Sequence, residues 1–438
     1  MIAPTSVHDA LRQNLLIDGY DMVLDLERSE GSWLVDSRDG TQYLDMFSFF
    51  GSNALGMNHP ALVGDQDFRR RLGAVALNKP PNSGVYTTEY AEFVETFSRV
   101  VGDRRLPHLF FIEGGALAVE NALKVAFDWK SRHNEALGVS PELGTQVMHL
   151  TKAFHGRSGY TMSLTNSAPV KVARYPKFAW PRIPVPATTF PYETDVAAVE
   201  AAEAAAVQLA RRAFEERPHD IAAFIAEPIQ AEGGDNHMRP AFLQAMQSLC
   251  HEFDALFILD EVQTGCGITG TPWAYDQLGL QPDIVAFGKK FHVCGIMAGG
   301  RVDDVADNAF HTSSRINSTW GGNLTDMVRA QKILEVIEGD QLFDRVGDLG
   351  AVLLAQLHSV QDRYPDLVSD VRGRGLLCAF DLPDGAARDR LLERMHTEER
   401  VILLPCGERS IRFRPTLTVQ ESELKSACMA LERVLARS

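Results

Sequence analysis

Two short apolar runs near the middle of the chain constrain its fold and its chemistry more than any other feature. The first run, Ala255–Leu259, is followed by Asp260, and the second, Ile284–Phe287, is followed by a glycine and then Lys289. Runs of this length that are rich in β-branched and aromatic residues predict buried strands. If the two strands are parallel, the carboxylate and the amine emerge at one carboxyl edge, where open α/β sheets bind ligands.

A glycine turn after another apolar run predicts a site for a phosphate group. The run Leu109–Ile112 leads into Glu113-Gly114-Gly115-Ala116 and then into a segment with helical periodicity. A glycine turn at a helix start exposes backbone N–H groups at the positive end of the helix dipole, where an anion binds well. A lone Gly-Gly is more often an ordinary tight turn, so this feature gains weight only from its neighbours.

Two further strand ends carry polar or aromatic side chains. Phe154 and His155 can stack on a planar heterocycle, and Arg157 can bind a carboxylate in a bidentate manner, although a capped loop with a solvated arginine is an equal alternative. Glu227 and Glu232 follow the apolar run Ile221–Ala226, in a loop that contains proline and glycine. We interpret them as two carboxylates with separate roles and not as an acid–base pair.

The order of these features favours a Schiff-base cofactor held between a lysine and an acid. The pyridinium nitrogen of pyridoxal phosphate must stay protonated to act as an electron sink, and it therefore needs a buried carboxylate partner. A close ion pair of this kind contributes roughly 4 kcal/mol at an effective dielectric of about 20. Asp260 stands at the required position, and Lys289 competes with Lys290 for the role of the amine. Taken alone, two lysines after a strand are usually solvated surface residues.

The alternation of apolar runs with helical segments predicts an α/β fold with a mostly parallel sheet. The length of 438 residues favours more than one domain. We expect an N-terminal segment 1–59 that packs with the small domain, a large domain 60–323 and a smaller C-terminal α/β domain 324–438. Further expected strands and helices are 147–150, 221–226, 116–130, 195–216, 241–253, 324–338, 341–364, 375–382, 401–404, 410–413 and 422–436, with a short helix at 7–17, a hairpin at 33–46 and a long loop at 165–192.

Composition excludes several other classes of function. The net charge of −15 argues against nucleic acid or an anionic membrane as a main partner. No apolar run is long enough to span a bilayer, and the N-terminus shows no secretory signal. The six cysteines are scattered without a CxxC pair, which favours free thiols and a cytoplasmic location. Without an HExxH motif or a Cys/His cluster in the sequence, we expect no metal.

A second motif offers a competing hypothesis. Residues 265–270 match GxGxxG, which is typical of dinucleotide-binding turns and would predict a nicotinamide oxidoreductase. The preceding run, however, ends at Asp260 and is separated from the motif by Glu-Val-Gln-Thr. The motif also lies mid-chain and not in a first βαβ unit, so we regard it as weak evidence.

The combined motifs resemble those of the class III, or ω-, aminotransferases, which are pyridoxal-phosphate enzymes of fold type I. The motifs are EGGALAVENALK, FHGR, AEPIQAEGG, DEVQTGCG, FGKK, NSTWGGN and IRFRP. Within that family, four longer blocks are most similar to the lysine ε-aminotransferases, namely FSFFGSNALGMNHP, LPHLFFIEGGALAVENALKVAFDWKSRHN, PHDIAAFIAEPIQ and NSTWGGNLTDM. The similarity spans nearly the whole chain.

The resemblance implies a cofactor-binding role for each matching residue. Lys289 would form the internal aldimine and transfer the proton, and Asp260 would pair with the pyridine nitrogen. The remaining implied contacts are with the phosphate (Gly115 and Ala116), the two ring faces (Phe154 and His155 opposite Val262), the ring oxygen (Gln263), the region around the aldimine and Gln263 (Glu227), and the phosphate of the other subunit (Thr319). The last contact implies a homodimer as the working unit.

The resemblance also implies substrate contacts. Arg157 would bind the α-carboxylate of lysine, and Arg412 would bind the α-carboxylate of 2-oxoglutarate. Glu232 would act as a switch that neutralises Arg412 when lysine is bound and releases it for the dicarboxylate. Gln263 is also expected beside the substrate, with Asn317 and Ser318 close to it near the subunit boundary.

The reaction implied by the resemblance is ping-pong transamination. L-lysine and 2-oxoglutarate would give 2-aminoadipate 6-semialdehyde and L-glutamate. A related alternative is another ω-aminotransferase that uses ornithine, 4-aminobutyrate or 2,4-diaminobutyrate as its amine donor. A more distant alternative is a non-catalytic pyridoxal-phosphate protein that binds the cofactor and turns nothing over.

Overall fold

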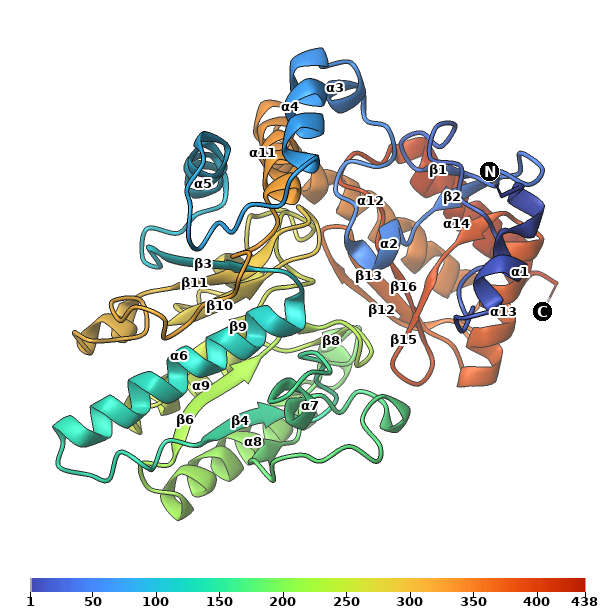
Figure 1. Cartoon of the computed structure of the whole chain (residues 1–438). Coiled ribbons are helices and arrows are strands. Elements are labelled where there is room, and N and C mark those ends of the chain that lie inside the picture. The colour runs from blue at the N-terminus through green and yellow to red at the C-terminus, as the bar shows by residue number, and fades with distance from the viewer. Residues whose placement is uncertain (1, 438) are drawn as a thin grey trace.

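A seven-stranded sheet forms the centre of the computed structural model, which describes residues 2–437 (Figure 1). The strand order is β3-β11-β10-β9-β6-β4-β5. Neighbours from β10 to β5 pair in parallel, whereas β11 is antiparallel to both β3 and β10. The bounds are β3 His108–Ile112, β4 Gln146–Leu150, β5 Arg182–Ile183, β6 Ile221–Ala226, β9 Leu256–Asp260, β10 Ile284–Phe287 and β11 Cys294–Ala298. The predicted α/β class with a mostly parallel sheet is confirmed, and the antiparallel strand β11 was not predicted.

The two strands that carry Asp260 and Lys289 are direct neighbours. Strands β9 and β10 pair in parallel, with Ala286 opposite Asp260. Every residue of both strands is buried, which explains why the sequence shows them as uninterrupted apolar runs. Their carboxyl ends therefore lie at one edge of the sheet, as the sequence analysis expected.

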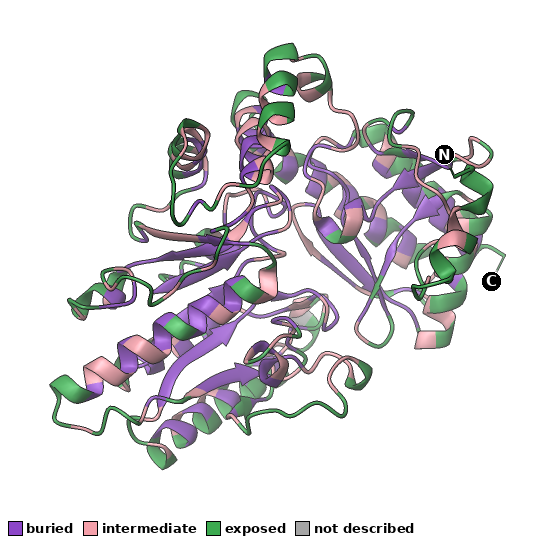
Figure 2. Ribbon diagram, in the orientation of Figure 1, coloured by how far each residue is buried: buried purple, intermediate pink, exposed green. Residues whose placement is uncertain are grey.

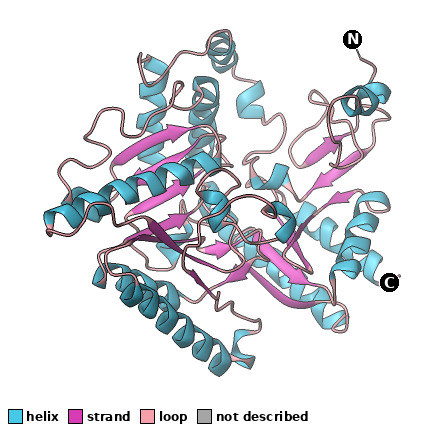
Figure 3. Cartoon of the chain, turned by 60° about the horizontal axis from the view of Figure 1, so that its bottom comes forward, coloured by secondary structure: helices cyan, strands magenta, loops and turns pink. Residues whose placement is uncertain are grey.

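Helices cover both faces of this sheet (Figures 1 and 3). Helix α6, Gly115–Ala136, lies on one face, where Ala118 and Val119 pack with alternate strand residues such as Ile225 and Ile258. Helices α8, Val196–Glu216, and α9, Pro240–Glu252, lie on the other face. The strands are buried almost throughout, and α6 alternates between buried and exposed residues (Figure 2). Two separate apolar cores thus fix the sheet from both sides.

A second α/β unit follows in the C-terminal part of the chain. Its four-stranded antiparallel sheet has the order β12-β13-β16-β15. The elements are α11 Leu324–Gly339, α12 Leu342–Arg363, β12 Ser369–Arg374, β13 Leu377–Asp381, α13 Gly385–Thr397, β14 Val401–Ile402, β15 Leu404–Cys406, β16 Ser410–Phe413 and α14 Glu421–Leu435. The other predicted elements of this region are present, but the predicted strand 401–404 is divided between β14 and β15, which belong to different sheets, and α13 and β12 were not predicted.

The N-terminal segment is joined to this second unit. Strands β1, Trp33–Val35, and β2, Gln42–Asp45, form the hairpin that the sequence predicted. Strand β14 pairs in parallel with β2, so residues near both ends of the chain share one small sheet. Figure 1 accordingly shows both termini on the same side of the molecule.

Shorter elements complete the chain. The expected helix at 7–17 is shorter than predicted and ends at Arg12 as α1, Val7–Arg12. The expected loop at 165–192 contains only β5 and a 3₁₀ turn within it. The others are α2 Ser48–Gly51, α3 Pro60–Val63, α4 Gln66–Ala76, α5 Thr88–Val100, α7 Thr161–Leu164, β7 Ile229–Gln230, β8 Asn236–His237 and α10 Ala274–Gln277. Among residues 2–437, none of the helices combines the length and the apolar character needed to cross a bilayer.

The GxGxxG motif has a structural explanation. Residues 261–272 form consecutive turns, and the helix that follows, α10, has only four residues, whereas a dinucleotide fingerprint requires a helix that begins at the motif. A Cβ on Gly267 would lie 2.5 Å from the ring of Phe343, which belongs to α12. The glycines therefore permit close packing against the second unit, and the dinucleotide-binding interpretation is wrong.

Candidate active site

All but three of the predicted residues converge on one cavity of about 680 Å³ at the carboxyl edge of the large sheet. The cavity is lined by Gly115, Ala116, Phe154, His155, Arg157, Glu227, Glu232, Asp260, Val262, Gln263, Lys289 and Arg412, among others. Seven further lining residues were not in the predicted set: Phe50, Gly156, Ser158, Lys171, Ile229, Thr264 and Cys294. Concave sites in which several polar groups converge are the usual places where small molecules bind.

Asp260 is a buried acid whose side-chain partner is a histidine. Its Oδ2 lies 2.8 Å from Nδ1 of His155, and its Oδ1 accepts a hydrogen bond of 3.1 Å from the backbone N–H of Val262. Only 5 % of Asp260 is exposed. The pair joins residues 105 positions apart, and the sequence analysis had placed His155 over a ring face without expecting this bond. Within residues 2–437, Nε2 of His155 is buried without a hydrogen-bond partner.

Lys289 and Lys290 have different surroundings. Lys289 lines the cavity, its Nζ donates to the carbonyl oxygen of Phe50 at 3.1 Å, and its backbone has a φ of 55°. Lys290 points elsewhere, with its buried Nζ donating to the carbonyl oxygens of Gly51 at 3.1 Å and Gln263 at 3.3 Å. The geometry gives Lys289 the access to the cavity that Lys290 lacks.

Burial changes the protonation of both amines. It lowers the pKa of Lys289 to about 8, with a further contribution from the positive charge of Arg412. Burial likewise lowers the pKa of Lys290 to about 7. A lysine nitrogen with a lowered pKa is uncharged in a larger fraction of molecules at neutral pH and is then a nucleophile.

The start of helix α6 forms an anion cradle beside the cavity. Gly114 has a φ of 97° and precedes the first helical residue, Gly115, and no side chain caps the helix. The first N–H groups of a helix have no partner within it. A Cβ on Gly115 would lie 2.9 Å from Cγ1 of Val262, so only glycine allows this close approach.

Glu227 connects two loops that form one wall of the cavity. Its carboxylate accepts hydrogen bonds from the backbone N–H groups of Phe154 at 3.0 Å and of Ala231 at 3.1 Å. Burial raises the pKa of Glu227 to about 7. The bonds to the backbone show that Glu227 holds the loop of Phe154 against the loop that leads to Glu232.

Glu232 and Arg412 form an ion pair inside the cavity. Nη2 of Arg412 donates to Oε2 of Glu232 at 2.6 Å, and Nη1 donates weakly to Oε1 of Gln263 at 3.4 Å. The same Gln263 oxygen accepts a bond of 3.0 Å from Nε of Arg414. Within residues 2–437, Nε of Arg412 is buried without a partner, which leaves a donor for a carboxylate.

Lys171 is a cation near the cavity mouth that the sequence analysis missed. Its ammonium contacts Oε1 of Glu232 and lies 5.2 Å from the ring centre of Phe154. Arg157, by contrast, is exposed, and no ion pair joins it to another side chain in the described part of the chain. The cavity thus contains one paired arginine deep inside and one available arginine at its edge.

Three predicted residues do not reach this cavity. Asn317 and Thr319 are exposed and Ser318 between them is half-buried; Ser83 donates to the carbonyl oxygen of Thr319 at 3.1 Å, and Ser318 accepts from the N–H of Gly321. A single chain therefore does not bring them to the site that it forms with Lys289.

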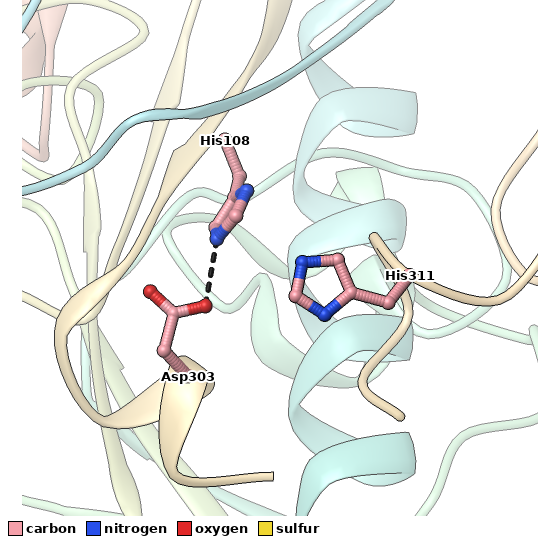
Figure 4. Close-up of side chains that lie close together, drawn as sticks. All are labelled: His108, Asp303 and His311. Atoms are coloured by element: carbon pink, nitrogen blue, oxygen red, sulfur yellow. Dashed lines mark hydrogen bonds and ion pairs between the residues drawn. The ribbon is translucent and has the colours of Figure 1, made fainter. Parts of the chain in front are cut away.

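Outside the cavity, the fold brings together two histidines and an aspartate from two separate parts of the sequence (Figure 4). His108, Asp303 and His311 come together near the start of β3. Nε2 of His108 lies 2.7 Å from Asp303, and Nδ1 of His311 lies 2.8 Å from the carbonyl oxygen of Ala306. These local bonds satisfy the group and attach the segment after β11 to β3.

Comparison with known proteins identifies the family. The model of the family "Aminotransferase class-III" matches residues 17–435. The chain belongs to the class-III aminotransferases. Among curated members of this family, the L-lysine-epsilon aminotransferase of Mycobacterium tuberculosis is 60 % identical over 432 residues, covering 99 % of this chain and 96 % of that protein. The enzyme of the same name from Streptomyces clavuligerus is 58 % identical and covers 97 % and 93 %.

Solved structures of aminotransferases have the same fold. Lysine aminotransferase from M. tuberculosis in the internal aldimine form has a TM-score of 0.98 at 60 % identity, with 100 % of both chains covered. An ornithine aminotransferase from Toxoplasma gondii has a TM-score of 0.81 at 23 % identity, covering 100 % and 96 %, and supports the fold alone. The fold is that of the fold type I pyridoxal-phosphate enzymes, and this class-III aminotransferase uses pyridoxal phosphate.

The residues of the cavity fit that cofactor. Three features lie at the same cavity: the buried acid Asp260, the uncapped N-terminus of α6 at Gly115, and Lys289 with its lowered pKa. The unpartnered Nε2 of His155 adds a polar atom that requires a partner. This set matches the needs of an aldehyde with a basic ring nitrogen and a phosphate.

Proposed function

We propose that this enzyme transfers the ε-amino group of L-lysine to 2-oxoglutarate, giving 2-aminoadipate 6-semialdehyde and L-glutamate. The relatives named for lysine support the donor, since they are about 60 % identical over nearly the whole chain. The Glu232–Arg412 pair supports the acceptor and is the observation that carries the proposal. We place the reaction in the cytoplasm, in keeping with six free cysteines.

The electrostatic problem of the reaction explains the paired arginine. Lysine brings one carboxylate and a cationic chain, whereas 2-oxoglutarate brings two carboxylates. With Glu232 on Arg412, the deep end of the cavity is neutralised and suits an uncharged or cationic chain. With Glu232 moved away, the guanidinium of Arg412 is available for bidentate binding of a carboxylate. Arg157 then binds the other carboxylate at the exposed edge of the cavity.

Each cofactor-holding residue has one task. Pyridoxal phosphate supplies an electron sink when bound. Asp260 keeps a proton on the ring nitrogen, and His155 orients Asp260 through the bond to Oδ2. Gly115 and Ala116 hold the phosphate by their N–H groups, Phe154 and Val262 enclose the ring, and the side-chain amide of Gln263 donates to its oxygen. Nζ of Lys289 accepts and returns the proton that moves during amino transfer.

We further propose that the working unit is a homodimer with active sites at the subunit boundary. The positions of Asn317, Ser318 and Thr319 outside the cavity of their own chain, with Asn317 and Thr319 exposed, support this arrangement. In it, Thr319 contacts the phosphate of the cofactor in the neighbouring subunit, and Asn317 and Ser318 lie near the substrate. A two-fold axis would supply both sites at once.

A panel of amine donors with 2-oxoglutarate tests the function. Purified holoenzyme is expected to form glutamate fastest from L-lysine, and more slowly from ornithine, 4-aminobutyrate or 2,4-diaminobutyrate. Product from lysine should cyclise and be detectable as the ring form. Glutamate formation from one of the other donors but not from lysine would replace the proposed donor. No turnover with any donor would favour a non-catalytic cofactor-binding protein.

A further inference from the structure

Two cations share the carboxylate of Glu232. Arg412 binds Oε2 at 2.6 Å, and Lys171 contacts Oε1. Lys171 ends a 3₁₀ turn, Pro169–Lys171, in the loop between β4 and β5, whereas Arg412 belongs to β16 of the other sheet. Glu232 is therefore held between the two structural units at the site, with one oxygen toward each.

The two cations differ in burial. The side chain of Arg412 is 3 % exposed, that of Lys171 is 22 % exposed and that of Glu232 is 27 % exposed. Lys171 lines both the main cavity and an adjoining hollow that it shares with Arg157 and Ser158. The ring of Phe154 below its ammonium restricts where the amine can lie. Lys171 is thus the partly exposed cation, facing the adjoining hollow, and Arg412 is the buried one.

Release of Arg412 leaves a carboxylate in need of a partner. When a dicarboxylate takes the guanidinium, Glu232 loses its contact at Oε2, and an unpaired, partly buried carboxylate is unfavourable. With Lys171 present, each anion still has one cation, since the substrate carboxylate pairs with Arg412 and Glu232 pairs with Lys171. Without Lys171, two anions compete for a single arginine.

We propose that Lys171 is a specificity-determining residue that retains Glu232 in its released position while Arg412 binds the dicarboxylate. The inference rests on the proposed function, because it assigns a partner to the moving glutamate of that reaction. Burial favours the protonated form of Glu232, yet the charge of Arg412 and the hydrogen bond from Lys171 outweigh it and lower the pKa of that carboxyl. Once Arg412 is released, Lys171 is the cation that remains beside the carboxylate of Glu232.

The test separates the two half-reactions of Lys171→Met holoenzyme in single-turnover absorbance measurements. We expect kcat/KM for 2-oxoglutarate to fall roughly tenfold, mainly through KM. Without Lys171, the closed Glu232–Arg412 pair becomes more stable relative to the released position of Glu232, and 2-oxoglutarate must compete with it for Arg412. The half-reaction with the amine donor should change by less than about twofold, since the Glu232–Arg412 pair is then closed. Lys171→Arg, which keeps a cation, should restore most of the acceptor half-reaction.

A matched control and a double variant make the result specific. Lys124→Met removes a charge from an exposed position on α6 and should leave both half-reactions unchanged. In a Glu232→Gln background the effect of Lys171→Met on 2-oxoglutarate should disappear, because the carboxylate that Lys171 retains is gone.

Two results would overturn the proposal. Equal losses in both half-reactions would mean that Lys171 only shapes the cavity mouth, and an unchanged acceptor half-reaction would mean that Glu232 needs no second cation. Failure of the proposed function is visible separately, in wild-type enzyme that does not accept lysine. The acceptor half-reaction can then still be measured with whichever donor the panel identifies.

Discussion

Replacement of Asp260 by asparagine tests the central electrostatic contact of the site. Asparagine keeps the size of the side chain and can still accept the bond from the N–H of Val262, but it removes the negative charge. A close charge pair with the ring nitrogen contributes roughly 4 kcal/mol at about 4 Å and an effective dielectric of about 20. At about 1.4 kcal/mol per factor of ten, that corresponds to nearly three decades in the protonation equilibrium.

We therefore expect the rate of the lysine half-reaction to fall roughly 10²- to 10³-fold in Asp260→Asn. The rate is measured in single turnovers by stopped-flow absorbance, on enzyme whose cofactor content is first matched to wild type. The neighbouring acid provides the control. Glu261 is buried like Asp260 but is not among the residues that line the cavity, and its carboxylate accepts from the hydroxyl of Thr264 and the N–H of Tyr275.

Glu261→Gln should clearly lower the thermal stability, whereas the rate per bound cofactor should change little. The two oxygens of Glu261 accept from Thr264 and from Tyr275, and a glutamine amide has only one oxygen, so one of these donors loses its acceptor. A rate for Asp260→Asn within fivefold of wild type at full cofactor content would refute the reasoning. It would show that the ring nitrogen does not depend on this carboxylate.

Three further predictions concern the lysines and the assembly. Borohydride reduction of the holoenzyme followed by peptide mapping should label Lys289, which lines the cavity, and leave Lys290 unlabelled; a label on Lys290 would reverse the assignment. In cofactor-free enzyme, the rate of cofactor rebinding should rise with pH and level off above about 8. Burial lowers the pKa of Lys289 to about 8, and the uncharged amine is the form that reacts. A continued rise toward pH ~10 would indicate a lysine with an unshifted pKa. Mixed dimers of Lys289→Ala and Thr319→Ala chains should recover activity that each homodimer lacks, because one site of the mixed dimer keeps both residues. If activity does not recover on subunit exchange, Thr319 does not contribute to the neighbouring site.

The strands of the large sheet could be predicted because their burial leaves a direct trace in the sequence. Strands β9 and β10 are buried at every residue and appear as apolar runs, with bounds that differ from the prediction by one residue or none. Strand β11 has the sequence CGIMA and lies directly after the Lys289 loop. Its glycine interrupts the apolar run and hides it, and no local pattern encodes that it runs antiparallel to both neighbours.

Helix α13 escaped prediction for a related reason. Only Leu391 and Met395 of its 13 residues are buried, so its apolar stripe is narrow, and charged residues are interspersed along the segment. Periodicity detects a helix by the width of its buried face. A helix that covers a small sheet along its edge gives little of that pattern, whereas α6, with buried residues along its whole length, was predicted readily.

The residues of the candidate site also fall into two groups, those that local rules predict and those that they do not. Asp260 and Lys289 stand directly at strand ends, and Gly115 stands at a helix start, so local rules predict that they emerge at the edge of the sheet. The bond between His155 and Asp260 and the contact of Lys171 with Glu232 join residues 105 and 61 positions apart. Such pairings depend on how loops fold over the sheet, and a loop without periodicity carries no indication of them.

The two sheets contribute different parts of the chemistry. In the mechanism that we propose, the residues that hold the cofactor belong to the large sheet and its loops, whereas the guanidinium that binds the acceptor belongs to β16 of the second sheet. Glu232 lies between them, with its oxygens directed to cations from opposite sides. Exchange of partners at one carboxylate can therefore change the substrate preference of the cavity while the groups around the cofactor stay fixed. Because a ping-pong enzyme must bind two unlike substrates in one space, placing the selective charge on a separate unit from the cofactor lets each be positioned independently.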